Sequence, residues 1–174
     1  PAADCRPLHA DQAPMPKPLV FLMGRSPVFL PTDRLYARSH FWALPQQQGY
    51  RFGFSAYAVR LLGDVKWLRW TAQVGAFIDA GQQIGFIEAS KATSDLYAPV
   101  SGRMSQINAE VLADPTLINS DLYDRAWLFL IDGPAGELLR PEDYLAHLEA
   151  NWPLAERLLK GQANFKGQAG GREP

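Results

Sequence analysis

The 174-residue sequence holds a single cysteine, and its 17 lysine and arginine residues nearly balance its 18 aspartate and glutamate residues. One cysteine excludes a disulfide within the chain and favours a reducing compartment such as the cytoplasm. The net charge of -1 gives no basis for a nucleic-acid-binding protein. The apolar run Leu19–Met23 is far too short to cross a bilayer, and it lacks the flanks of a signal peptide. We therefore expect a soluble, cytoplasmic, single-core protein that binds neither nucleic acid nor membranes.

Motifs for metals, nucleotides and nucleophiles are lacking as well. The sequence has no Cys-x-x-Cys, His-Glu-x-x-His, calcium-loop, Walker, Gly-x-Gly-x-x-Gly or Gly-x-Ser-x-Gly pattern. The three histidines, His9, His40 and His147, lie in unlike contexts, and Cys5 has no plausible base near it in the sequence. We expect no metal site and no catalytic residue.

Proline and glycine divide the chain into four parts. Residues 1–30 contain six of the 14 prolines, which predicts an extended, mobile arm with neither helix nor sheet pairing. Residues 161–174 are rich in glycine and glutamine and predict a flexible tail. Between them we expect a folded domain over residues 31–133 and helices over residues 134–160. The chain begins with Pro1, which suggests processing or shortening, and Met23 is a candidate start.

Short apolar runs with period-two alternation predict a mainly β domain. We expect strands over 50–54, 65–70, 84–87, 104–107 and 127–131. One short helix is expected between Ser55, which can cap its start, and Gly63, which can end it. A second helix should begin at Pro141 and stop before Pro153, and another short helix should follow over residues 154–160.

Lys91 lies at the centre of a predicted hairpin. The apolar runs 84–87 and 96–100 flank a small polar segment, and Ala89, Ser90 and Ala92 are too small to shield the lysine. Its amine would protrude where another enzyme could acylate it. On this local pattern alone, a solvated turn lysine is the alternative interpretation.

The hairpin resembles the lipoyl and biotinyl carrier domains, and specifically the H proteins of the glycine cleavage system. Those proteins have a Glu-Ser-Val-Lys-Ala-x-Ser-Asp stretch followed by Pro-Val-Ser-Gly. The corresponding residues here are Glu-Ala-Ser-Lys-Ala-Thr-Ser-Asp over 88–95 and Pro-Val-Ser-Gly over 99–102. The resemblance extends over about residues 31–150, and it includes Pro31, Asp33, Tyr36, His40, Trp42, Gly53, Tyr57, Gly63, Asp64, Asn108, Pro115, Asn119, Tyr123, Trp127, Glu142 and Tyr144.

The resemblance implies a lipoyl-domain barrel-sandwich hybrid of two small antiparallel sheets, with short helices and a C-terminal helical appendage. It implies lipoate joined covalently to Lys91 and a non-catalytic, monomeric carrier that shuttles an aminomethyl group. The implied partners are a lipoate ligase or a lipoyl/octanoyl transferase, together with glycine decarboxylase, aminomethyltransferase and dihydrolipoyl dehydrogenase.

The same resemblance assigns further site residues. Glu88 matches the acidic position that lipoylating enzymes recognise, although it could simply solvate a strand face. Asp95, Ser39, His40 and Phe41 match positions near the loaded arm, and Asp95 and Ser39 could equally be turn or cap residues.

Some positions depart from the family pattern. Phe41 replaces the glutamate of the His-Glu-Trp pattern, which removes a carboxylate that could hold a cationic amine. Arg60 replaces an acidic residue, and the balanced charge contrasts with the acidic character of the family. Two alternatives therefore stay open: a specialised H-like carrier in acyl or sulfur metabolism, and an unmodified scaffold or regulatory module with the same fold.

Overall fold

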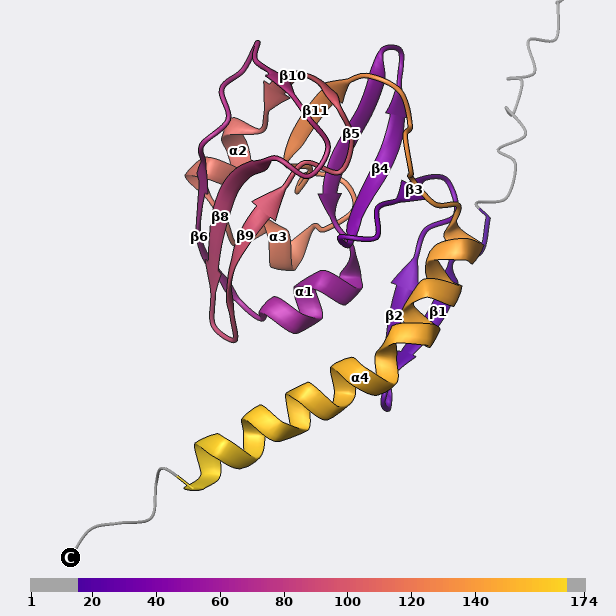
Figure 1. The fold of residues 1–174 in the computed structure, drawn as a ribbon, viewed down its shortest axis with the longest axis vertical. Helices are drawn as coiled ribbons and strands as arrows, with labels where there is room; N and C mark the ends of the chain where they lie inside the picture. Colours follow the sequence, from indigo (N-terminus) through magenta and orange to yellow (C-terminus); the bar gives the residue numbers. More distant parts are fainter. Residues whose placement is uncertain (1–15, 169–174) are drawn as a thin grey trace, which may run out of the picture.

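The computed structural model describes residues 16–168, and it folds them into three antiparallel sheets and four helices (Figure 1). A six-stranded sheet has the order β3-β4-β5-β11-β10-β7, and a three-stranded sheet has the order β6-β8-β9. Strands β1 and β2 form a separate hairpin. The elements are β1 Leu19–Met23, β2 Ser26–Leu30, β3 Leu35–Tyr36, β4 Phe41–Gln46, β5 Gly49–Phe54, α1 Ala56–Leu62, β6 Val65–Trp70, β7 Phe77–Ile78, β8 Gln83–Ala89, β9 Thr93–Tyr97, β10 Gly102–Ile107, α2 Ala109–Ala113, α3 Leu117–Ser120, β11 Phe129–Asp132 and α4 Pro141–Gln168.

The six-stranded and three-stranded sheets share one hydrophobic core. Phe52 and Phe129 of the larger sheet and Ile84 and Ile87 of the smaller sheet are fully buried in it. Over residues 85–89 of β8, buried and partly exposed residues alternate with the period of two that is typical of a strand. The expected mainly β fold with two facing antiparallel sheets is therefore confirmed, as are the five predicted strands.

Helix α1 forms where the sequence predicts it. The side chain of Ser55 accepts a hydrogen bond from the Ala58 amide, and Gly63 ends the helix with φ of 77°. A glycine adopts this left-handed conformation without the steric cost that other residues have.

The expectation that residues 1–30 contain no sheet pairing is wrong for residues 19–30. These residues form the β1–β2 hairpin, which we call the N-terminal hairpin. Five of the six prolines precede Leu19, and Pro27 lies in a two-stranded sheet where every strand has a free edge. Apolar side chains on one face of the hairpin then pack on α4 and α1, among them Phe21 and Leu30. Residues 1–15 lie outside the described part.

Helix α4 is longer than predicted. It begins at Pro141 as expected, but it continues through Pro153 to Gln168, so the expected break and the expected tail over residues 161–168 are wrong. A helical proline removes one backbone hydrogen bond, and here that loss does not end the helix. Tyr144 and Leu148 anchor the first turns against the N-terminal hairpin. Residues 169–174 lie outside the described part.

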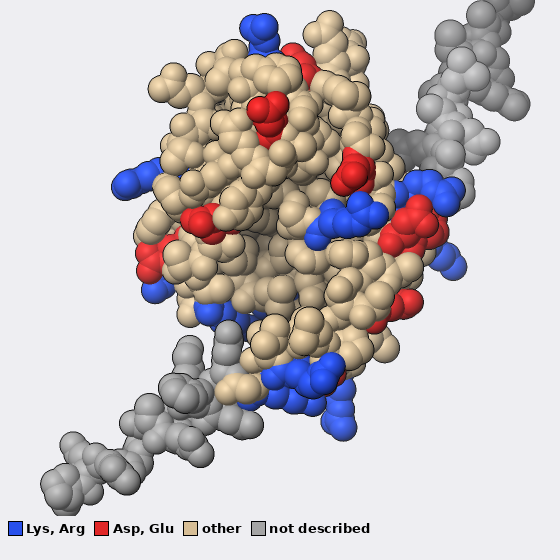
Figure 2. Space-filling model, viewed as in Figure 1, with Lys and Arg blue, Asp and Glu red and all other residues tan. Residues whose placement is uncertain are grey.

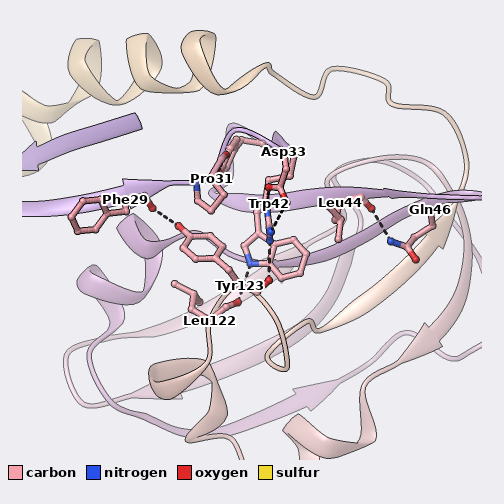
Figure 3. A network of polar contacts seen from close by, with 10 residues as sticks. Phe29, Pro31, Asp33, Trp42, Leu44, Gln46, Leu122 and Tyr123 are labelled. Carbon is pink, nitrogen blue, oxygen red and sulfur yellow. Dashed lines mark hydrogen bonds and ion pairs between the residues drawn. The ribbon is translucent and has the colours of Figure 1, made fainter. Parts of the chain in front are cut away.

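A polar and aromatic cluster joins residues 29–34, which we call the N-terminal segment, to the two-sheet body of the protein (Figure 3). The guanidinium of Arg34 pairs with Asp33 and lies over the rings of Trp42 and Tyr123. Trp42 donates its indole N–H to the Leu122 carbonyl at 3.2 Å. Because Arg34 donates to Asp33, the pKa of that carboxyl lies below its ordinary value.

Among the described residues, no helix combines the length and the apolar character that crossing a membrane requires. Within residues 16–168, no three His, Cys, Asp or Glu side chains are grouped as metal ligands.

Candidate functional site

Lys91 is exposed at the tip of the β8–β9 hairpin, as the sequence predicts. The tip is fixed by backbone hydrogen bonds to the end of α1 and the loop after it. The Lys91 amide donates to the Leu62 carbonyl at 2.9 Å, and the Ser90 amide donates to the Asp64 carbonyl at 2.8 Å. The Ser90 hydroxyl accepts from the Asp64 amide at 2.9 Å. The lysine therefore projects from a rigid platform rather than from a mobile loop.

Gly63 makes this close contact possible. A Cβ at residue 63 would lie 2.3 Å from Ser90 Oγ and 3.0 Å from Lys91 Cγ. The position therefore requires glycine for two reasons, namely the positive φ and the space taken by the tip.

Replacing Gly63 with alanine should destabilise the protein more than the same change at Gly24. Both glycines have positive φ, which costs alanine about 1–2 kcal/mol, but Gly24 has open space around it. The clash at residue 63 should add roughly 1–3 kcal/mol. Urea unfolding of the two variants measures the difference, and equal losses would contradict the packing that we describe.

A pocket of about 400 Å³ lies beside the tip, between α1 and β9, and we call it the first pocket. Four predicted site residues, Ser39, His40, Phe41 and Asp95, line it together. The sequence did not identify the apolar wall, which comes from Ala58, Leu61 and Leu62 on one face of α1. A helical spacing of three to four residues was the available indication of that shared face.

Lys91 and Glu88 are not among the residues that line the first pocket. Glu88 lies on β8, paired with Trp67 of β6 and Thr93 of β9. Its carboxylate is thus on the outer face of the three-stranded sheet, beside an indole that is 42% exposed.

His40, which lines the first pocket, is held by a chain of polar contacts. Its Nδ1 lies 2.9 Å from the Tyr144 hydroxyl, which lies 2.9 Å from Ser55 Oγ. Burial, together with nearby His147, lowers the pKa of His40 to about 4. His40 is therefore neutral at pH 7, and Tyr144 can donate to its ring while accepting from Ser55.

The lowered pKa of His40 predicts a loss of stability in acid. The unfolded chain binds this proton near pH 6.5, and the folded protein binds it near pH 4. Folding therefore loses free energy as the pH falls from about 6.5 to 4, by about 2–3 kcal/mol. Chemical unfolding at each pH should show a steeper decline for the wild type than for His40→Gln. Parallel declines would show that His40 is not the group responsible.

Phe41 is part of the core as well as of the pocket wall. It is 2% exposed, stacks on Phe54 with ring centroids 5.2 Å apart, and meets the edge of Phe129 at 5.5 Å. The pocket is consequently apolar where the family pattern has a glutamate. A Phe41→Glu change would bury a carboxylate in this aromatic stack, so it is a poor test of that departure.

Comparison with known proteins identifies the fold and the family. The sequence pattern of the family described as Glycine cleavage H-protein matches residues 34–150, which is more than half of the chain. The chain belongs to this family. The H protein of Beutenbergia cavernae is 40% identical over 118 residues, which is 67% of this chain and 94% of that protein. An H protein of Thermus thermophilus is 35% identical over 125 residues, covering 70% of this chain and 97% of that protein.

A solved structure agrees with this assignment. The crystal structure of a glycine cleavage system H protein from Mycobacterium marinum has a TM-score of 0.61 and 33% identity, covering 67% of this chain and 97% of that chain. The fold and the family support a lipoyl carrier role of the H-protein type for this chain. The N-terminal hairpin and the second half of α4 lie outside the family match.

Proposed function

We propose that lipoate is joined by an amide to Lys91, and that this protein carries it in glycine cleavage. The observation that supports this proposal is the position of Lys91 within the family match. Lys91 is exposed, lies at a tip that two backbone hydrogen bonds fix, and is next to small side chains. The amine can enter the active site of another enzyme while its platform stays folded. When attached, the lipoyl group supplies a dithiol that holds the transferred one-carbon unit.

Glu88 and the outer face of the three-stranded sheet would be the surface that a lipoate ligase or a lipoyl/octanoyl transferase recognises. Glu88 is three residues before Lys91, and Trp67 lies opposite it on β6. A carboxylate next to a partly exposed indole offers both a charge and an apolar contact to a partner.

The first pocket would hold the end of the arm when it carries cargo. Asp95 provides a negative charge at the pocket, while Ser39 and neutral His40 offer polar atoms. Phe41 and the α1 face exclude water from the other side. These residues orient and shelter a bound group, and no reaction of their own is proposed for them.

Glycine decarboxylase, aminomethyltransferase and dihydrolipoyl dehydrogenase are the proposed partners, in the cytoplasm. On the face shown in Figure 2, acidic and basic side chains are interspersed across the two-sheet body. Docking to these enzymes should therefore depend less on ionic strength than docking of a strongly acidic carrier.

Isotope exchange tests this function. Purified glycine decarboxylase should exchange the carboxyl carbon of glycine with bicarbonate when the lipoylated protein is added, with an established H protein as the positive control. Complete lipoylation without exchange would contradict the role in glycine cleavage. That result would favour a carrier for another pathway, for which the absence of a carboxylate at Phe41 is the structural argument.

A further inference from the structure

A second pocket, of about 550 Å³, lies on the opposite face of α1 from the first. Val59 and Arg60 line it, whereas Ala58, Leu61 and Leu62 line the first pocket. With 3.6 residues per turn, these two sets lie on opposite sides of the helix. Lys91 lines the second pocket and not the first.

The stem of Lys91 passes beside Gly63 at the second pocket. A Cβ on Gly63 would meet Lys91 Cγ at 3.0 Å and Cδ at 3.3 Å, and Gly63 itself lines the pocket. A group attached to the amine is therefore on the same side of α1 as the second pocket, and it enters this pocket without passing over the helix.

The N-terminal hairpin, which lies outside the family match, forms one wall of the second pocket. Tyr123 fixes the hairpin here, because its hydroxyl donates to the Phe29 carbonyl at 2.8 Å and accepts from the Ala56 amide at 2.9 Å. Pro27 and Phe29 line the pocket, and Phe29 is 52% exposed. A large aromatic side chain left half in water beside a pocket favours an apolar occupant.

We propose that the second pocket binds the uncharged, unloaded lipoyl arm of Lys91. This inference rests on the proposed attachment of lipoate to Lys91. An eight-carbon acyl chain ending in a disulfide ring is apolar, and it matches a wall made of Pro27, Phe29 and Leu122. Arg60, whose guanidinium donates to the Pro27 carbonyl at 3.4 Å, places a positive charge at the same pocket. Asp64 lines this pocket as well, so the preference for an uncharged arm rests on the apolar wall, against which an ammonium group would lose its hydration.

Methyl NMR of the lipoylated protein locates the arm. Mass spectrometry first establishes that Lys91 is lipoylated. An unmodified lysine at this step would reject the proposed function, and not the binding of the arm in the second pocket. Compared with the unmodified chain, lipoylation should shift the methyl signals of Val59 and Leu122 more than those of Leu61 and Leu62. Larger shifts at Leu61 and Leu62, or equal shifts at both pairs, would overturn the proposal.

Two matched variants test the hairpin wall. A water-soluble phosphine should reduce the arm's disulfide about five-fold faster in Phe29→Ser than in the wild type, because the arm is no longer shielded. Val20→Ser should leave the rate unchanged, because Val20 pairs with Phe29 and is 47% exposed but does not line the pocket. Equal rates in all three proteins would contradict shielding by this wall.

Alkylation of the reduced arm tests the selection by charge. Capping it with iodoacetamide leaves it neutral and should retain the shifts at Val59 and Leu122. Capping it with 2-bromoethylamine adds ammonium groups and should abolish them. Shifts that persist with the cationic cap would overturn the preference of this pocket for an uncharged arm.

Discussion

Replacing Lys91 with arginine is expected to abolish the incorporation of lipoate while leaving the fold intact. Arginine keeps the positive charge and the length of the side chain, but a guanidinium does not form the amide that lysine forms. The side chain is exposed, so its replacement removes no core contact. Co-expression with a lipoylating enzyme followed by intact-mass measurement should show no adduct on the variant.

Lys66→Arg is the matched control for this change. Lys66 is another exposed lysine of the same three-stranded sheet, but it lies on β6, opposite the end of β8, and not in the β8–β9 tip itself. Its variant should accept lipoate as the wild type does. An adduct on Lys91→Arg, or its loss in Lys66→Arg, would show that a different lysine is the acceptor.

Replacing Trp42 with alanine is expected to destabilise the protein by about 3–5 kcal/mol. Trp42 is 1% exposed, donates to the Leu122 carbonyl and lies under the guanidinium of Arg34. Its ring fills the space above Gly53, where even a Cβ would lie 2.4 Å from it. Alanine would leave a cavity and an unpaired carbonyl where the N-terminal segment joins the body.

Urea unfolding measures this loss, with Trp67→Ala as the comparison. Trp67 has the same side chain but is 42% exposed on the outer face of the three-stranded sheet. Its replacement should cost less than about 1 kcal/mol, since surface changes away from such packing have small effects. A loss for Trp42→Ala as small as the one expected for Trp67→Ala would mean that the cluster around Trp42 contributes little to the fold.

Local patterns were sufficient to predict the strands and the short helix α1 of the two-sheet body, whereas the arrangement in two sheets came from the family resemblance. Over residues 85–89 of β8, buried and partly exposed residues alternate, and α1 has both a serine cap and a glycine stop. Each of these features depends on neighbouring residues, so the sequence specifies it without knowledge of the tertiary structure.

The two terminal elements depend on each other, and this is why the sequence did not predict the N-terminal hairpin or the continuation of α4 through Pro153. The N-terminal hairpin is stable because Phe21 and Val28 pack with Tyr144 and Leu148, more than 100 residues away. The first turns of α4 gain the same contacts, and the helix then continues through Pro153. Proline content alone indicated an arm without sheet pairing at the N-terminus and a helix that stops before Pro153.

The candidate site was predicted in part. The structure brings Ser39, His40, Phe41 and Asp95 into one pocket and places Lys91 at the tip, while their roles stay predictions. The second pocket could not be predicted, because one wall comes from Pro27 and Phe29, which were expected to lie in a mobile arm.

The mass of the Lys91 peptide, measured on the chain isolated from its own cell, tests the central claim most directly. A lipoyl group on Lys91, and on no other lysine, is the result that the carrier assignment predicts. An unmodified Lys91 in cells whose other lipoyl carriers are fully modified would contradict it.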